Sequence, residues 1–337
     1  MTKLHTRTIG SLTVSSIGLG CMNLSHAYGA PPPAEEGGRL LNRALDLGVT
    51  FLDTAALYGG GNNERLLAAS VMHRRGEFTL ASKCVLDLID GKRVLDGRPE
   101  TIAGSLDRSL QRLGTDHIDL YYLHRLDKAV PIEESVGALA RAVEAGKIGA
   151  IGLSEMSAAT IRRAHAVHPV AAIQSEYSPA VRNVEIAVLD ACRELGIGFV
   201  AFSPVARGLL ADGVRDDTYA EGDIRAVMPR FTGANLEHNL KAVARFNALA
   251  AGLGITPAQL SLAWVMAQGD DIVPIPGTSN IAHLEEDIGA AAVTLDADTV
   301  AQVDAIFVEG AILGHRYTPA MQAQIDTETF PGELEPA

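Results

Sequence analysis

Four polar residues of the sequence could together protonate a carbonyl oxygen. Asp53, Lys83 and His124 each end a β-rich apolar run, and Tyr58 lies in the loop that follows Asp53. Tyrosine has an ordinary pKa of about 10, so it needs help to donate a proton near neutral pH. A lysine ammonium stabilises the tyrosinate, and a carboxylate paired with the lysine keeps the amine charged. A nearby histidine can hydrogen-bond a carbonyl oxygen as negative charge develops on it.

These residue types predict general-acid-assisted reduction of a carbonyl, with Tyr58 as the acid. Lys83 and Asp53 would assist it, and His124 would position the substrate. The hydride must come from a cofactor, because no side chain can supply one. Taken singly, each residue also fits a structural role: Asp53 could cap a turn, His124 could be a buried barrel histidine, Lys83 a solvated strand end and Tyr58 an exposed loop aromatic.

The elements that carry these residues alternate between apolar β-branched runs and helical periodicity, which is typical of a parallel sheet covered by helices. Eight strands are predicted, at Ile17–Gly20, Thr50–Asp53, Phe78–Lys83, Ile118–His124, Ile148–Ser154, Ala171–Ser175, Gly198–Ser203 and Ile272–Pro276. Eight strand-then-helix units favour a closed (β/α)8 TIM barrel over an open doubly wound sheet. The carboxyl ends of barrel strands face one mouth, so the four residues would meet there.

Turn and cap residues punctuate the expected helices. The first helix should run from about Ala34 to a C-terminal glycine at Gly48, and Ser157 should cap another. Before the first strand, two short β-like arms around Gly10 and Ser11 predict a hairpin that closes the barrel bottom. A long loop over residues 205–234 suggests a functional lid, and residues 312–337 suggest a surface arm. The whole chain, 1–337, is expected to be one domain.

Composition and charge narrow the function classes. The 337 residues, 47% of them hydrophobic, suffice for one large core, and the formal net charge of −13 argues against nucleic acid as a partner. No apolar run reaches the roughly 20 residues of a membrane helix, and the N-terminus lacks a signal-peptide core. We therefore expect no membrane partner and a cytoplasmic location. Three cysteines lack metal-binding spacing, and the His165 and His168 pair lacks a third ligand, so no metal is predicted.

The order and spacing of several motifs resemble the aldo-keto reductases over nearly the whole chain. These motifs are GVTFLDTAALYGGGNNE, LASK, SLQRLGTDHIDLYYLH, GKIGAIGLSE, IQSEYSP, FVAFSPVARGLL and VPIPGTSN. The resemblance implies a (β/α)8 barrel and a catalytic tetrad of Asp53, Tyr58, Lys83 and His124. It also implies a nicotinamide dinucleotide bound in an extended form, without a Gly-rich Rossmann turn.

The same resemblance implies a set of cofactor-binding residues. Ser154 and Gln174 would hydrogen-bond the carboxamide, and Phe202 would stack on the nicotinamide ring. Gly20, Met22 and Asp53 would lie near the ring and the substrate. The pyrophosphate would follow Ser203, Pro204, Gly208 and Leu210, and the adenosine end would be held by Ile275, Gly277, Thr278, Ser279, His283, Glu286 and Asp287.

Two positions depart from the family pattern. Glu155 follows Ser154 where many members have Asn, so an amide contact to the carboxamide would be lost or replaced. Residues 277–287, GTSNIAHLEED, contain no Lys or Arg. Members that prefer NADPH commonly place basic residues there, because a 2′-phosphate favours charge-assisted bonds. The resemblance favours NADP(H), but this segment leaves NAD(H) open.

Other functions remain open at this stage. The chain could be a dinucleotide-binding regulatory subunit with little turnover, similar to the potassium-channel β-subunits. A different barrel enzyme, such as an isomerase or lyase, is supported by fold analogy alone. The expected partner is a small-molecule carbonyl or alcohol substrate. The sequence does not identify that substrate, the direction of reaction or the oligomeric state.

Overall fold

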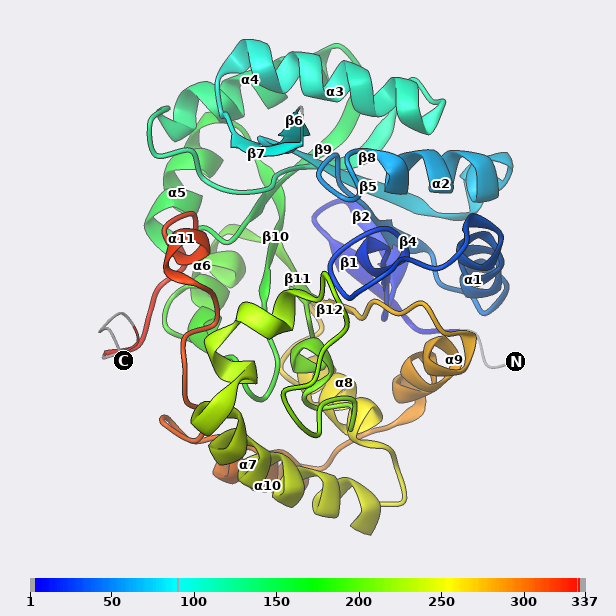
Figure 1. The fold of residues 1–337 in the computed structure, drawn as a ribbon. Coiled ribbons are helices and arrows are strands. Elements are labelled where there is room, and N and C mark those ends of the chain that lie inside the picture. The colour runs from blue at the N-terminus through cyan, green and yellow to red at the C-terminus, as the bar shows by residue number, and fades with distance from the viewer. Residues whose placement is uncertain (1–3, 90, 332, 334–337) are drawn as a thin grey trace.

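The computed structural model, which describes residues 4–89, 91–331 and 333, has a parallel barrel at its centre (Figure 1). The sheet order is β12-β11-β10-β9-β8-β5-β4-β3. Two backbone hydrogen bonds of 3.0 Å join its ends, from Gly18 to Pro274 and from Gly20 to Pro276. The strands are β3 (Leu19–Gly20), β4 (Phe51–Asp53), β5 (Thr79–Cys84), β8 (Ile118–Leu123), β9 (Ile148–Ser154), β10 (Val170–Glu176), β11 (Gly198–Phe202) and β12 (Ile272–Ile275). The predicted (β/α)8 TIM barrel is confirmed, with each strand within about two residues of its expected bounds.

Helices surround the barrel because each has an apolar stripe that must be buried. In α1 (Ala34–Asp46), Leu40, Leu41 and Ala44 are fully buried, and Gly48 follows with a φ of +91°. The other helices are α2 (Asn62–Val71), α3 (Pro99–Leu113), α4 (Ile132–Glu144), α5 (Ala158–Val167), α6 (Val188–Leu195), α7 (Gly233–Gly252), α8 (Pro257–Ala267), α9 (Ile281–Gly289), α10 (Ala297–Ile306) and α11 (Pro319–Gln322). Short 3-10 turns lie at Met22–Leu24, Met72–Glu77, Asn183–Glu185, Ala206–Gly208, Ile224–Val227, Pro229–Phe231 and Ala290–Ala292.

An antiparallel hairpin closes the bottom of the barrel, as the sequence predicts. Its strands are β1 (Thr6–Ile9) and β2 (Leu12–Ser15). Gly10 turns the chain at a φ of +57° so close to the sheet that an added Cβ would lie 2.8 Å from the Ala171 Cβ. Ile9 and Val14 are fully buried and pack with residues that face the barrel interior.

A second hairpin, which our sequence reading missed, lies at the mouth of the barrel. Its strands β6 (Leu86–Ile89) and β7 (Lys92–Leu95) follow directly after β5. The Asp90-Gly91 pair between two alternating runs is the signal that predicts such a turn, although Asp90 itself lies outside the described residues.

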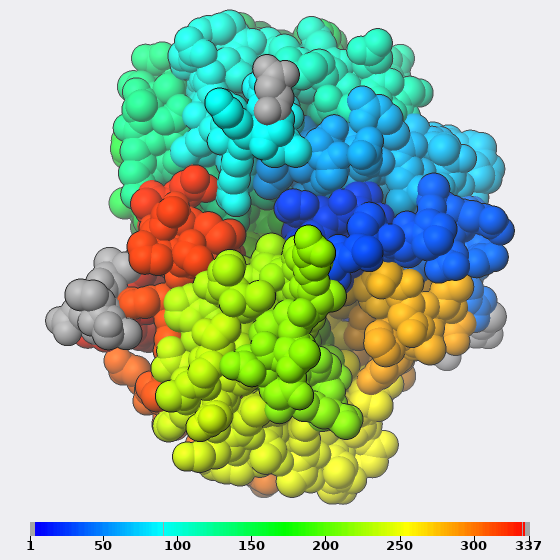
Figure 2. Space-filling model, viewed as in Figure 1, coloured from blue at the N-terminus to red at the C-terminus, as the bar shows by residue number. Residues whose placement is uncertain are grey.

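Two long segments cover the open mouth of the barrel. Figure 2 shows residues 205–234, in yellow-green, lying against the blue segment near the start of the chain, and the Ile224 N–H donates to the Ala27 carbonyl at 2.9 Å. The C-terminal segment differs from the expected surface arm, because Arg316, Tyr317 and Thr327 are each less than 5% exposed. Residues 332 and 334–337 of that arm lie outside the described part of the chain.

Within the described residues, no single helix is long and apolar enough to span a membrane. Only α7 and α8 together reach that length and composition, and the two are bent by 89°.

Candidate active site

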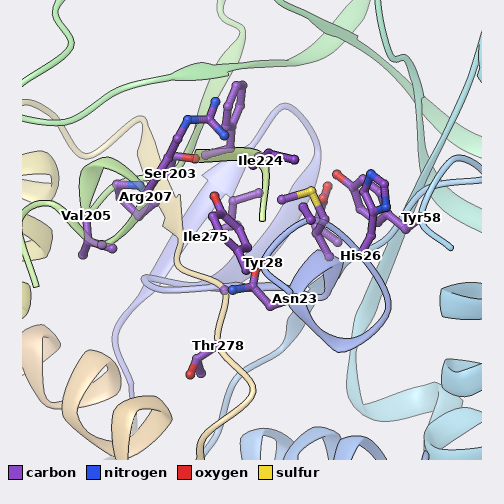
Figure 3. A pocket seen from close by; sticks show the side chains of 18 of the residues that line it. Asn23, His26, Tyr28, Tyr58, Ser203, Val205, Arg207, Ile224, Ile275 and Thr278 are labelled. Carbon is purple, nitrogen blue, oxygen red and sulfur yellow. The ribbon is translucent and has the colours of Figure 1, made fainter. Parts of the chain in front are cut away.

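A cavity of about 390 Å³ opens at the carboxyl ends of the strands. Most of the predicted site residues line it, namely Gly20, Met22, Asp53, Tyr58, His124, Ser154, Gln174, Phe202, Ser203, Pro204, Gly208, Ile275, Gly277, Thr278, Ser279, His283, Glu286 and Asp287. Figure 3 shows Tyr58 beside His26 at one side of the cavity, with Ser203 and Val205 at the other. Its volume lies in the usual range for small-molecule sites.

Lys83 connects Asp53 and Tyr58 of the predicted tetrad from beneath the cavity. Its ammonium donates to the Asp53 carboxylate, to the Thr54 carbonyl at 2.9 Å and to the Tyr58 hydroxyl at 3.3 Å. The Lys83 side chain is fully buried, and the Asp53 side chain is 2% exposed. The Gln174 amide donates to the second Asp53 oxygen at 2.8 Å. Gln174 therefore holds Asp53, and Asp53 holds Lys83. The fixed Lys83 ammonium in turn orients the Tyr58 hydroxyl.

These contacts set the protonation states. Burial lowers the pKa of Lys83, but attraction to Asp53 and Tyr58 outweighs it and leaves the pKa raised. Burial raises the pKa of Tyr58, and the opposing attraction of Lys83 only partly offsets that increase. At neutral pH the lysine is therefore charged and the tyrosine protonated. The sequence-based expectation that Lys83 would lower the Tyr58 pKa describes one contribution, whereas burial decides the net direction.

Two histidines flank the Tyr58 ring. His124 meets it edge-on with centroids 5.8 Å apart, and His26, which the sequence analysis missed, stacks against it at 6.5 Å. Burial, followed by the charge of Arg125, holds the pKa of His124 well below its ordinary value. Its Nδ1 is buried and has no hydrogen-bond partner among the described residues. His124 is therefore a neutral ring with unused hydrogen-bonding capacity.

The two side chains that were predicted to bind the carboxamide already form hydrogen bonds within the chain. Ser154 Oγ accepts a bond of 3.2 Å from Arg125, and the Gln174 amide nitrogen donates to Asp53. Leu210 does not line the cavity. Its side chain is fully buried in the core, and its N–H donates to the Val205 carbonyl at 3.1 Å. Of the predicted pyrophosphate contacts, only Leu210 lies away from the cavity.

At the opposite end of the cavity, Asp287 is 7% exposed and its carboxyl has no hydrogen-bond or ion-pair partner among the described residues. Burial raises its pKa to about 7, and the neighbouring Glu286 adds to the shift. Thr278 bonds to Asn280, which caps α9, whereas Ser279 and His283 are exposed. An unpartnered buried carboxyl beside exposed neutral donors fits a ligand with hydroxyl or amine groups.

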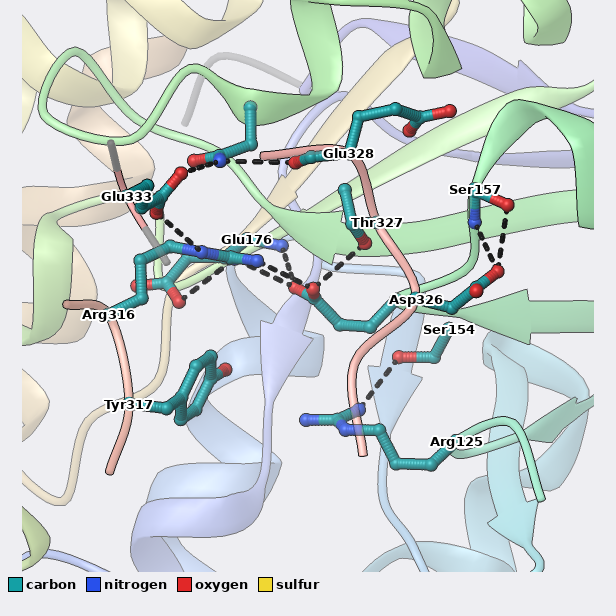
Figure 4. Close-up of polar contacts among 12 residues, drawn as sticks. Arg125, Ser154, Ser157, Glu176, Arg316, Tyr317, Asp326, Thr327, Glu328 and Glu333 are labelled. Atoms are coloured by element: carbon teal, nitrogen blue, oxygen red, sulfur yellow. Dashed lines mark hydrogen bonds and ion pairs between the residues drawn. The ribbon is translucent and has the colours of Figure 1, made fainter. Parts of the chain in front are cut away.

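The Glu155 side chain points away from the cavity and anchors the C-terminal arm. It accepts two bonds from Arg316, at 3.0 and 3.2 Å, and one from Thr327 at 3.0 Å. Figure 4 shows Arg316 reaching toward Glu176 and Glu333 as well. Glu155 itself has a φ of +54°, which a non-glycine residue rarely adopts. A carboxylate at this position therefore holds the arm against the barrel mouth.

Several cavity residues lie outside the motifs that we recognised in the sequence. They are Asn23, His26, Tyr28, Arg93, Arg125, Arg225, Tyr317 and Met321. Arg125 directly follows His124, so its position beside a predicted site residue was the one available signal. The others come from the β7 hairpin, from loops and short turns, and from the C-terminal arm, whose placement depends on contacts distant in sequence.

Comparison with known proteins adds independent findings. A model of the aldo/keto reductase family matches residues 16–307. The chain is 45% identical to an NADP(+) aldo-keto reductase of Schizosaccharomyces pombe, over 97% of this chain and 98% of that one. A glycerol dehydrogenase from Gluconobacter oxydans has a similar structure, with a TM-score of 0.82, 25% identity and coverage of 98% and 99% of the two chains. An aldo-keto reductase from Bacillus halodurans gives a TM-score of 0.75 at 25% identity, over 94% of this chain and all of that one.

The family match covers every strand of the barrel and every residue of the tetrad. This chain belongs to the aldo/keto reductase family.

Proposed function

We propose that this protein is an NAD(P)H-dependent oxidoreductase that interconverts an aldehyde or ketone and its alcohol. The observation that carries the proposal is the Tyr58 hydroxyl, which faces the cavity and lies 3.3 Å from the buried Lys83 ammonium. A protonated tyrosine that can give its proton to a substrate oxygen, and whose tyrosinate is then stabilised by a fixed cation, is suited to general-acid catalysis.

The chain's own residues would handle the proton and the orientation of the substrate. Tyr58 donates its proton to the carbonyl oxygen as that oxygen gains negative charge, and Lys83 stabilises the tyrosinate that remains. Asp53 keeps Lys83 charged throughout. The neutral His124 ring hydrogen-bonds the carbonyl oxygen and fixes its direction. In the reverse reaction Tyr58 accepts the proton of the alcohol.

A bound nicotinamide dinucleotide would supply the hydride that no side chain can provide. Ser154 and Gln174 would hold its carboxamide, and the half-buried Phe202 ring offers a stacking surface on the cavity wall. The buried, unpartnered carboxyl of Asp287 supports binding of the adenosine end near α9.

The choice between NADPH and NADH is a separate part of the proposal. The fission yeast relative is named for NADP(+), which supports NADPH. Residues 277–287 contain no Lys or Arg, and the exposed Ser279 and His283 could offer only neutral hydrogen bonds to a 2′-phosphate. Neutral hydrogen bonds are roughly half as strong as charge-assisted ones. We therefore propose that the enzyme accepts both cofactors.

A spectrophotometric panel tests the proposed function. Purified protein is mixed with NADPH or NADH and a series of aldehydes and ketones, and with the oxidised cofactors and a series of alcohols that includes glycerol. The expected result is consumption of reduced cofactor with at least one carbonyl substrate. Tight cofactor binding with no turnover on the whole panel would contradict the enzyme proposal and favour a regulatory subunit.

A further inference from the structure

Two arginines line the cavity without a carboxylate partner among the described residues. Arg125 is only 9% exposed, and its guanidinium donates to the His124 carbonyl at 2.6 Å and to Ser154 Oγ at 3.2 Å. Arg93 lies on β7 of the hairpin over the mouth and is exposed. Neither forms an ion pair within the described part of the chain. Burying the Arg125 guanidinium without a carboxylate in direct contact is costly, so its presence calls for an explanation.

The other cations at the cavity are neutralised. Lys83 is paired with Asp53, Arg207 with Glu176 at 3.1 Å, and Arg225 with Asp223 at 2.7 Å.

The nearby acids are also occupied. Arg316 lies 3.0 Å from Glu155 and 3.5 Å from Glu176, and it holds both carboxylates in the buried cluster of the C-terminal arm. The positive charge of Arg93 and Arg125 therefore remains available to a ligand, although the chain as a whole carries a net charge of −13.

The charges of the two guanidinium groups act on the same part of the cavity. Partial burial of its guanidinium lowers the pKa of Arg93, and the charge of Arg125 lowers it further. The charges of Arg125 and Arg93 also contribute to the lowered pKa of His124, after burial. An anion bound between two such cations would relieve their mutual repulsion and form charge-assisted hydrogen bonds with both.

The position of the pair favours the substrate over the cofactor as the source of that anion. Arg93 and Arg125 follow β5 and β8, whereas the residues predicted to hold the dinucleotide phosphates and adenosine follow β11 and β12 across the barrel. Figure 4 shows the Arg125 side chain extending toward Tyr317 of the C-terminal arm, which also lines the cavity. Arg125 is adjacent to His124, the proposed carbonyl-binding residue, so a second group on the same small substrate could reach it.

We propose that Arg125 and Arg93 form an oxyanion-binding subsite that selects carbonyl substrates carrying a carboxylate or phosphate group. This inference rests on the proposed carbonyl reductase function. The subsite explains why two arginines face the cavity of an acidic protein without a carboxylate partner among the described residues. Arg125 would make the closer contact, and Arg93 would guide the anion at the entrance.

The test compares matched charged and neutral substrates. One pair is terephthalaldehydic acid and its methyl ester, and the other is glyceraldehyde phosphate and glyceraldehyde, so that the two pairs distinguish carboxylate from phosphate. The measured quantity is the ratio of kcat/KM for the anionic member to that for the neutral member. We expect this ratio to exceed one in the native protein for at least one pair, and to fall about tenfold or more in Arg125→Gln.

Three further variants separate charge recognition from structural support. Arg93→Gln, which alters an exposed residue, should lower the same ratio by a smaller factor. Arg125→Lys should keep part of the ratio that Arg125→Gln loses, because the charge remains. Arg39→Gln removes one surface charge far from the cavity and should leave the ratio unchanged. If Arg125→Gln lowers kcat/KM equally for the anionic and the neutral substrate of each pair, Arg125 only supports His124 and Ser154, and the inference is wrong.

A binding measurement keeps the inference testable without turnover. Isothermal titration of the full chain, with and without NADP(+), compares para-toluate with the neutral para-toluamide. The inference predicts tighter binding of the anion and loss of that preference in Arg125→Gln. Equal binding of the two compounds would overturn the inference. Preferential anion binding in a protein that reduces no carbonyl would support the subsite while the proposed function fails.

Discussion

The Lys83 ammonium lies 3.3 Å from the Tyr58 hydroxyl oxygen, and both side chains are buried where the barrel strands end. Burial alone would keep the tyrosine protonated and too weak an acid. The lysine supplies the charge that stabilises the tyrosinate when a proton leaves, and Asp53 compensates the buried lysine. The proposed chemistry of the site and the stability of the barrel are therefore expected to depend on the same ion pair.

Replacing Lys83 with methionine should cost both activity and stability. The buried Asp53 carboxylate would lose its counterion, and breaking one side of a buried pair typically costs about 3–5 kcal/mol. Urea unfolding followed by circular dichroism measures the loss. Lys147→Met, which breaks an exposed pair with Asp107, is the control and should change stability little. Equal midpoints for native protein and Lys83→Met would show that the pair contributes no net stability.

Glu155→Gln should loosen the C-terminal arm in a pH-dependent way. Burial raises the pKa of Glu155, but the charges of Arg316 and Arg125, together with its hydrogen bonds, outweigh burial and hold that pKa at about 2, below its ordinary 4.5. A depressed pKa contributes stability above pH 4.5 that is lost as the pH falls toward 2. The free energy of unfolding of the variant should therefore be lower than that of the native protein by about 3 kcal/mol at pH 7. This gap between the two proteins should narrow below pH 4.5.

Equilibrium unfolding at several pH values measures that gap, and limited proteolysis reports on the arm. Glu133→Gln, at an exposed pair with Arg163, serves as the control. A gap that stays constant down to pH 3 would show that the charge of Glu155 is not what holds the arm.

Asp287→Asn should stabilise the protein without cofactor at alkaline pH. Burial raises the pKa of Asp287 from 3.8 to about 7, so the folded state holds a proton that the unfolded state releases. Stability falls as the pH rises through that window, and the amide removes the penalty. The gain should be roughly 2–4 kcal/mol at pH 8 and absent below pH 3.8. Thermal unfolding across this range, with the exposed Asp116→Asn as control, measures it; a gain independent of pH would contradict the explanation.

His283→Arg should shift the protein toward NADPH. An arginine at this exposed position beside the adenosine end could form charge-assisted bonds to a 2′-phosphate, and the ratio of kcat/KM for NADPH over NADH should rise about tenfold or more. His73→Arg, on a distant 3-10 turn, is the matched control. Native protein should use both cofactors with comparable efficiency. A preference for NADPH of about a hundredfold in the native protein would contradict the proposed acceptance of both.

The barrel and the positions of the tetrad could be predicted because they depend on local patterns. A parallel strand that ends in a polar residue places that residue at a common mouth, whatever the rest of the chain does. The Asp-Gly pair beside β7 carried the same kind of local signal for the second hairpin, and we missed it.

The arm and the arginine subsite could not be predicted in this way. Glu155 and Arg316 are separated by 161 residues, and only the fold shows that they meet. The sequence contains Arg93, Arg125 and Arg207, but which of them is neutralised depends on contacts made across the barrel. Arg207 pairs with Glu176, whereas the other two face the cavity unpaired among the described residues.

The most direct test of the account is a single-turnover measurement on Tyr58→Phe. The variant keeps the aromatic ring but has no proton to donate, so the rate of NADPH oxidation by a reactive aldehyde should fall about 10³-fold. The dissociation constant for NADPH, followed by fluorescence, should change little. Tyr219→Phe, whose hydroxyl bonds to the Phe231 carbonyl outside the cavity, is the matched control. A Tyr58→Phe protein that reduces the aldehyde at the native rate would contradict the assignment of Tyr58 as the general acid.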